Sequence, residues 1–63
     1  MRLDRVKVFA EAMKQDLNCQ QLAKKAGVSK STVYGIKSGR SCSSETADKI
    51  ADALGVTVDS LKE

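Results

Sequence analysis

The first part of the chain repeats apolar residues at steps of three and four, which is the spacing of one face of an α-helix. This pattern predicts a helix over residues 3–14. The predicted inner face of that helix and its continuation consists of Leu3, Val6, Phe9, Ala10, Met13 and Leu17.

Two short helices are predicted next, with a glycine between them. Asn18 is a favoured N-cap, and Gln21 can bond back to the amide of the cap, so a helix is expected over residues 19–26. Gly27 ends this helix, because glycine adopts the left-handed conformation at little cost. Ser29 caps a third helix over residues 30–38.

Two further helices complete the prediction. Ser43 caps a helix over residues 44–54, which ends at Gly55, and Thr57 caps a last turn over residues 58–62. No segment of useful length alternates with the period of two that a strand requires. The sequence therefore predicts an all-α fold, a compact five-helix domain spanning residues 1–63.

The pair of helices around Gly27 has the arrangement of a helix-turn-helix. The helix before Gly27 has a small apolar face made of Leu22, Ala23 and Ala26. The helix after Gly27 is held from one side by Val33 and Ile36. The other side of the second helix stays exposed. This is the geometry that places a helix in the major groove of DNA.

The positions of the charged residues along the chain favour a polyanionic partner. Residues 17–44 contain five basic and no acidic residues, whereas residues 45–63 carry a net charge of −3. The whole chain has a net charge of +3. The basic window of residues 17–44 covers the predicted helix-turn-helix. A solvated lysine-rich surface is the simpler interpretation of such a window, but this coincidence favours DNA.

Composition narrows the class of protein further. The chain has no His, and Cys19 and Cys42 lack the spacing of a zinc site, so we expect reduced thiols and no metal or other cofactor. A redox switch at Cys19 is the alternative, because a helix start lowers a thiol pKa. With no hydrophobic signal or membrane segment, we expect a cytoplasmic protein with no membrane partner.

The chemistry of base readout selects the candidate contacts. Lys30 can reach guanine, Ser29 and Ser31 can bond base edges, and Tyr34 can contact a phosphate or a thymine methyl. Gly35 either permits close approach to DNA or reflects weak selection at that position, since a glycine within a helix costs about 1 kcal/mol. The candidate phosphate contacts are Asn18, Cys19, Gln20, Lys37, Ser38, Arg40 and Ser41.

Residues 17–61 resemble the Cro/phage-repressor family of helix-turn-helix regulators, also called XRE-like. The resemblance is carried by two segments in register, LNCQQLAKKAGVS at 17–29 and IADALGVTVDSL at 50–61. LacI-type regulators share a run similar to AGVSKSTV at 26–33, but their turn motif lies almost at the N-terminus. The match departs from the family pattern at Cys19, at Gly35 and at Lys37.

The resemblance implies a sequence-specific regulator of transcription, more often a repressor, that binds a palindromic operator as a homodimer. By position, it implies base contacts from Ser29, Lys30, Ser31 and Gly35, and phosphate contacts from Asn18, Cys19 and Arg40. We expect the dimer surface in the acidic C-terminal part, around residues 54–61.

Two other classes of function are weighed against this one. A protein-interaction module on the same scaffold, such as an antitoxin-like or antirepressor domain, would place its binding energy in an exposed apolar patch. An enzyme acting on a small-molecule substrate is disfavoured, because the chain lacks His, paired carboxylates in a pocket and a phosphate-binding glycine loop.

Overall fold

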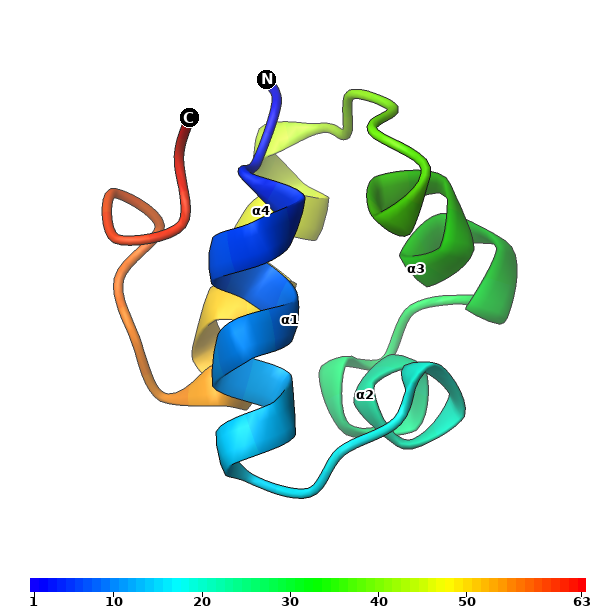
Figure 1. Cartoon of the computed structure of the whole chain (residues 1–63). Helices are drawn as coiled ribbons and strands as arrows, with labels where there is room; N and C mark the ends of the chain where they lie inside the picture. Colours follow the sequence, from blue (N-terminus) through cyan, green and yellow to red (C-terminus); the bar gives the residue numbers. More distant parts are fainter.

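A computed structural model describes residues 1–63 as four α-helices joined by short loops (Figure 1). The helices are α1 (Arg5–Lys14), α2 (Cys19–Ala26), α3 (Lys30–Lys37) and α4 (Ser44–Leu54). The structure has no strand, and Leu3 and Lys62 form an isolated antiparallel bridge. The all-α prediction is confirmed, while the number of helices is four and not five.

Local capping fixes both ends of α2. The amide of Gln21 donates to Asn18 Oδ1 at 2.7 Å, and the amide of Asn18 donates to Gln21 Oε1 at 2.9 Å, which completes the expected capping box. Gly27 has a φ of +73° and ends the helix in the left-handed region. The predicted bounds of α2 are those observed.

The two later helices also begin at their predicted caps. The hydroxyl of Ser29 accepts the amide of Thr32, and the hydroxyl of Ser43 accepts the amide of Thr46. Helix α4 ends at Gly55 as expected, but α3 ends at Lys37, one residue before the predicted end.

The first helix begins later than the pattern predicted. Asp4 is its N-cap, and its Oδ1 accepts the amide of Val6 at 2.9 Å and that of Lys7 at 3.4 Å. Leu3 is extended and bridges Lys62 instead, while the amide of Asp4 donates to Leu61 O at 2.7 Å. The predicted start at residue 3 is therefore wrong, because the C-terminal segment pairs with the backbone there.

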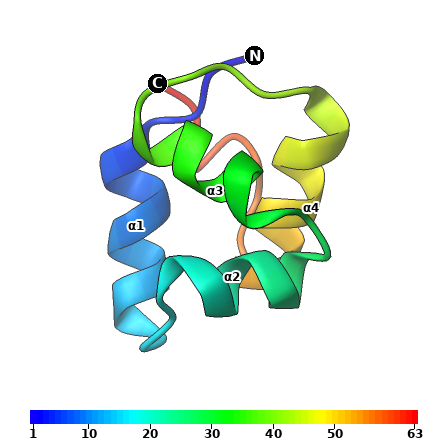
Figure 2. The same cartoon turned by 90° about the vertical axis from the view of Figure 1, so that its right-hand side faces the viewer.

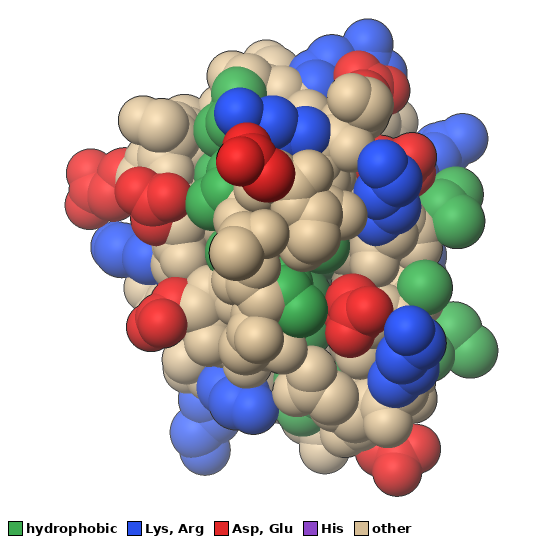
Figure 3. All heavy atoms as spheres, turned by 90° about the vertical axis from the view of Figure 1, so that its left-hand side faces the viewer, with side chains coloured by type: hydrophobic (Ala, Val, Ile, Leu, Met, Phe, Trp, Pro, Cys, Tyr) green, Lys and Arg blue, Asp and Glu red, His purple; other side chains and the backbone are tan.

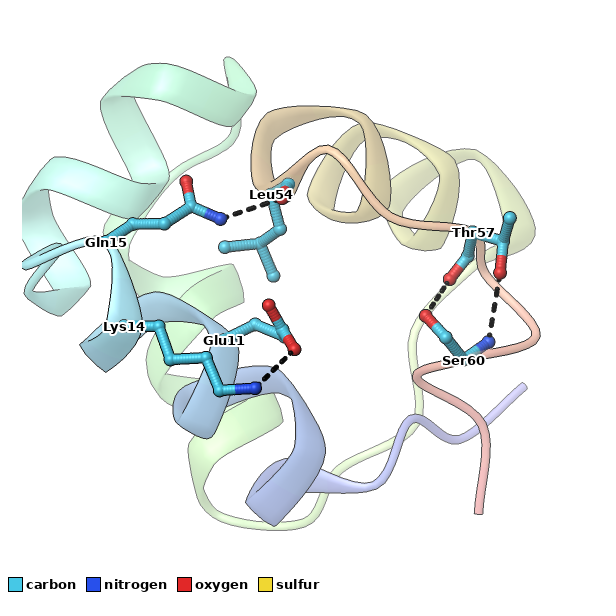
Figure 4. A network of polar contacts seen from close by, with 6 residues as sticks. All are labelled: Glu11, Lys14, Gln15, Leu54, Thr57 and Ser60. Carbon is cyan, nitrogen blue, oxygen red and sulfur yellow. Dashed lines mark hydrogen bonds and ion pairs between the residues drawn. The ribbon is translucent and has the colours of Figure 1, made fainter.

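The predicted inner face of α1 is right only in part: Leu3 is buried and Phe9 and Leu17 pack against the core, but Val6, Ala10 and Met13 are exposed. Val8 and Ala12 are fully buried, whereas Val6 is 71% exposed and Met13 is 75% exposed. Apolar residues occur all around this helix, so steps of three and four fit more than one face. The small side chain of Ala12 lies against the core, and Gln15 at the end of the helix donates to Leu54 O at 2.7 Å (Figure 4).

The predicted fifth helix at residues 58–62 is a single turn. The amides of Leu61 and Lys62 donate to Val58 O, and Ser60 bonds Thr57 through both its amide and its hydroxyl (Figure 4). The helix cannot continue because Lys62 enters the bridge to Leu3 immediately afterwards. Leu61 is fully buried as expected, and Val58 is half-buried.

The core lies between α1, α4 and the helix pair α2–α3. All thirteen buried side chains are apolar, and no buried side-chain polar atom lacks a hydrogen bond. Leu22, Val33 and Ile50 are among the largest fully buried side chains. No charged side chain is buried, so the charges of the chain lie at the surface.

We predict that the two valines of α1 differ sharply in their contribution to folding. Val8→Ala should lower the free energy of unfolding by about 2 kcal/mol, because it removes two buried methyl groups and leaves a cavity. Val6→Ala, the matched control, should change it by less than about 0.5 kcal/mol. Urea titrations followed by circular dichroism measure both values, and a larger loss for Val6→Ala would restore the face predicted from the sequence.

Candidate nucleic-acid interface

The turn between α2 and α3 sets the angle at which α3 is presented (Figure 2). After the left-handed residue Gly27, the amide of Val28 donates to Ala23 O at 3.0 Å. Ala23 is 2% exposed, so its small side chain allows the following helix to lie close to α2. Helix α3 is then held from one side by Val33 and Ile36, which are buried.

The opposite side of α3 carries three of the predicted base contacts. Lys30, Ser31 and Tyr34 are exposed, and none of their side chains forms a hydrogen bond or ion pair within the chain. Positions 30, 31 and 34 share one side of the helix, so the structure brings these groups together. They form a polar surface whose donors are all available to a ligand.

Ser29 caps α3, which none of the other predicted base contacts does. Its hydroxyl accepts the amide of Thr32 at 3.2 Å and shares a 2.8 Å hydrogen bond with the hydroxyl of Thr32. The side chain lies at the exposed end of α3, but the cap already occupies it. Contact of Ser29 with a base stays a prediction.

Gly35 is covered by Arg40, which the sequence analysis did not foresee. The amide of Arg40 donates to Gly35 O at 2.9 Å, and Arg40 Cδ would lie 3.6 Å from a Cβ placed on Gly35. That distance is an ordinary van der Waals contact, so Arg40 covers the glycine without requiring it. The stem of Arg40 thus lies against α3, beside an open hollow of about 330 Å³ that Ser31 and Ser41 also line.

The predicted phosphate contacts fall into two groups at different places. Asn18, Cys19 and Gln20 lie at the start of α2, while the other group follows the end of α3. Asn18 Oδ1 is occupied by the capping box, and Cys19 is half-buried against the core, whereas Gln20 is exposed. At this group the available donors are backbone amides and the side chain of Gln20.

The second group lies around the turn that follows α3. Lys37, Arg40 and Ser41 are exposed there, and the hydroxyl of Ser38 donates to Tyr34 O at 3.0 Å. Gly39 has a φ of +90°, a left-handed conformation that reverses the chain at this point. The reversal brings Arg40 back over α3 and leaves its charge at the surface.

The basic residues of the window 17–44 have no acidic partners. The four ion pairs of the structure join Lys14 to Glu11, Lys49 to Glu45, Lys62 to Asp59 and Arg2 to Glu63. None of these pairs involves Lys24, Lys25, Lys30, Lys37 or Arg40. The positive field of the window is therefore not cancelled by direct neighbours.

The structure adds two basic residues, Arg2 and Arg5, that are not among the predicted contacts. Arg5 Nη1 donates to Lys37 O at 3.5 Å, and Arg2 Nη2 lies 3.7 Å from a Cβ placed on Gly39. Both contacts join residues more than thirty positions apart, so no local pattern in the sequence signals them. Arg2 and Arg5 lie beside the turn that follows α3.

Both cysteines are free thiols. Burial raises the pKa of the Cys42 thiol, and the positive charge of the chain's amino terminus opposes that rise. Cys19 is half-buried against the core, and its proposed redox role stays a prediction.

Comparison with known proteins places this geometry in a family. Residues 9–61 match the family model described as Helix-turn-helix, which covers all four observed helices apart from the first turn of α1. No curated protein matches the chain. None of the four helices has the length and apolar character needed to cross a bilayer.

We predict that Gly35→Ala stabilises the fold. A Cβ at this position fits against the stem of Arg40, and alanine is about 1 kcal/mol better than glycine within a helix. Gly27→Ala is the matched control and should destabilise by about 1 kcal/mol or more, because Gly27 has a positive φ. Thermal unfolding of both variants measures the difference, and a destabilised Gly35→Ala would show that the helix and Arg40 cannot accommodate the added methyl group.

Proposed function

The chain belongs to the Cro/C1-type helix-turn-helix family, whose members bind DNA, and we propose that it is a sequence-specific regulator of transcription that reads the major groove with α3. A repressor is the form that we favour, since a bound domain excludes other proteins from the same DNA. One observation carries the proposal: the exposed side of α3 presents free polar groups on a helix whose other side is fixed in the core.

Each exposed group has a role in this proposal. The ammonium of Lys30 bonds guanine O6 or N7, and the hydroxyl of Ser31 bonds a base edge. Tyr34, which is 51% exposed, contacts a thymine methyl or a phosphate. Gly35 can contribute only backbone to a base contact and only where the stem of Arg40 does not cover it, and Ser29 contributes at the edge of the site.

Phosphates on either side of the groove hold α3 in place. At the start of α2, the unpaired backbone amides of Cys19 and Gln20 point outward from a helix N-terminus, which favours an anion. Asn18 keeps its side-chain amide as a donor, because only its oxygen is used by the cap. After α3, Lys37, Ser38, Arg40 and Ser41 supply the second set of contacts.

The proposal includes a homodimer on a palindromic operator. One such module buries about 600–1,000 Å² on DNA, which is small for tight specific binding, so two copies on half-sites one helical turn apart are expected. In the segment proposed as the dimer surface, Leu54 and Leu61 are buried and Val56 and Val58 are half-buried. Contacts there would come from exposed polar groups such as Thr57 and Asp59 and from the exposed parts of Val56 and Val58.

One observation favours a second candidate function, a protein-interaction module. Val6, Ala10 and Met13 lie at helical spacing on α1 and are all exposed. Figure 3 shows hydrophobic side chains protruding along its right-hand edge, the side on which α1 lies. Under this alternative, Lys30→Ala and Arg40→Ala would leave partner binding intact.

The proposed activity is binding, without a reaction, a cofactor or a small-molecule substrate. Duplex DNA is the partner that it requires, and we propose that the protein meets it in the cytoplasm. The DNA sequence itself is identified by selecting bound fragments from a random pool.

We predict that Lys30→Ala and Arg40→Ala weaken DNA binding in different ways. Lys30→Ala should weaken binding to the selected site by about 1–3 kcal/mol and reduce discrimination against random duplex. Arg40→Ala should weaken both kinds of DNA alike and reduce the slope of log K against log salt by about 1. Fluorescence anisotropy across a salt series separates the two effects. Binding that never exceeds the random duplex would contradict the proposed function.

We also predict that affinity depends on two correctly spaced half-sites. The wild-type chain should bind a palindrome with half-site centres about 10 base pairs apart with positive cooperativity, and an isolated half-site more weakly. Moving the centres apart by about 5 base pairs should remove the gain, because the two copies then lie on opposite sides of the duplex. Equal affinity for all three duplexes would overturn the homodimer.

A further inference from the structure

Four basic residues from separate parts of the sequence lie around the C-terminal end of α3 and the turn that follows it. We call Arg2, Arg5, Lys37 and Arg40 the α3-end cluster. Arg2 and Arg5 belong to the N-terminal segment and the first turn of α1, and Lys37 and Arg40 flank the turn at Gly39. Figure 2 shows the start of α1 beside the last turn of α3.

The contacts of Arg5 leave most of its charge uncommitted. Its one hydrogen bond is the 3.5 Å contact to Lys37 O, which is a long one, and it has no acidic partner. Lys37, whose carbonyl accepts this bond, carries a second cation at the same place. Stabilisation of the helix end by one cation is an ordinary effect, but two unneutralised cations together also repel each other.

Arg2 is the member of the cluster that has an acidic partner. Arg2 Nε lies 3.4 Å from Glu63 Oε1, and both side chains are more than half exposed, so the pair is weak. Asp4 lies in the same region, but its carboxylate oxygen accepts two amides of α1 as the cap. Glu63 is the acidic group paired with Arg2, so an incoming anion would compete with it, while the charge of Asp4 stays beside the hollow.

A hollow between the N-terminal segment and the end of α3 gives an anion room to reach these groups. Its volume is about 340 Å³, and it is lined in part by Arg2, Arg5, Ser38 and Gly39, with Asp4 and Glu63 at the same hollow. The guanidinium groups are planar donors with the geometry that suits phosphate oxygens. The hollow lies next to the turn that carries Arg40.

We propose that Arg2 and Arg5 bind a backbone phosphate of the DNA, and that Glu63 weakens this contact by competing for Arg2. The inference rests on the proposed function, because it requires α3 to lie in the major groove. It adds a phosphate contact from the N-terminal segment to the two groups predicted from the sequence. Base readout is not affected by this contact, since phosphates carry no sequence information.

The test compares two double variants that remove the same charge. Arg2→Gln with Arg5→Gln should lower affinity for the selected duplex by on the order of tenfold at 0.1 M salt, and should reduce the salt slope by about 1, because one phosphate contact is lost. The preference for the selected over a random duplex should stay unchanged. Lys14→Gln with Lys49→Gln, two lysines that are ion-paired within their own helices and do not line the hollow, should leave the slope at its wild-type value.

Two further variants separate binding from folding. Arg2→Lys with Arg5→Lys keeps the charge and should keep the wild-type slope, whereas a purely structural role for the guanidinium groups would lower the unfolding midpoint and leave the slope unchanged. Glu63→Gln should raise affinity by a fewfold, because it frees Arg2. A wild-type slope in the Arg2→Gln, Arg5→Gln variant would overturn the inference while the proposed function stands. Absence of salt-dependent DNA binding by the wild-type chain would overturn both.

Discussion

The left-handed turn at Gly27 is the constraint on which the presentation of α3 depends. It reverses the chain between two helices of eight residues each, and Ala23 lets those helices lie close together. Because Val33 and Ile36 then enter the core, the opposite side of α3 has to face outward. The exposed polar groups are thus a consequence of how α3 is held, and a change of angle at this turn would move all of them at once.

The core is built from small aliphatic side chains, which leaves all the charged groups at the surface for binding. A chain of 63 residues buries only about 60% of the surface that it exposes when unfolded, so its margin of stability is narrow. No charged side chain is buried, and the caps satisfy the helix ends with short local bonds. The basic groups at the surface therefore add no cost of burying a charge. Their repulsion is the expected cost, and a polyanionic partner would relieve it.

The sequence predicts the bounds of a helix well where the residues that fix them are neighbours in the chain. The bounds of α2 and α4 follow from caps that lie within three residues of their partners, and the glycines at their ends act alone. The prediction fails where residues far apart in the chain fix the structure. The start of α1 and the single turn at residues 58–62 both depend on the pairing of Leu3 with Lys62. The buried side of α1 is chosen by the core, and Arg5 reaches Lys37 across the fold, so neither could be read from spacing. Lys30, Ser31 and Tyr34 lie together as expected, because positions within one short helix fix their relation.

Amide chemical shifts measured during titration with the selected duplex test most directly whether the exposed side of α3 meets DNA. Uniform ¹⁵N labelling gives one signal for nearly every residue of this chain, which contains no proline. Large shift changes are expected at residues 29–40 and at the start of α2, with little change along the exposed side of α4. Shifts at residues 29–40 that stay constant while the DNA binds would contradict the proposal that α3 reads the groove.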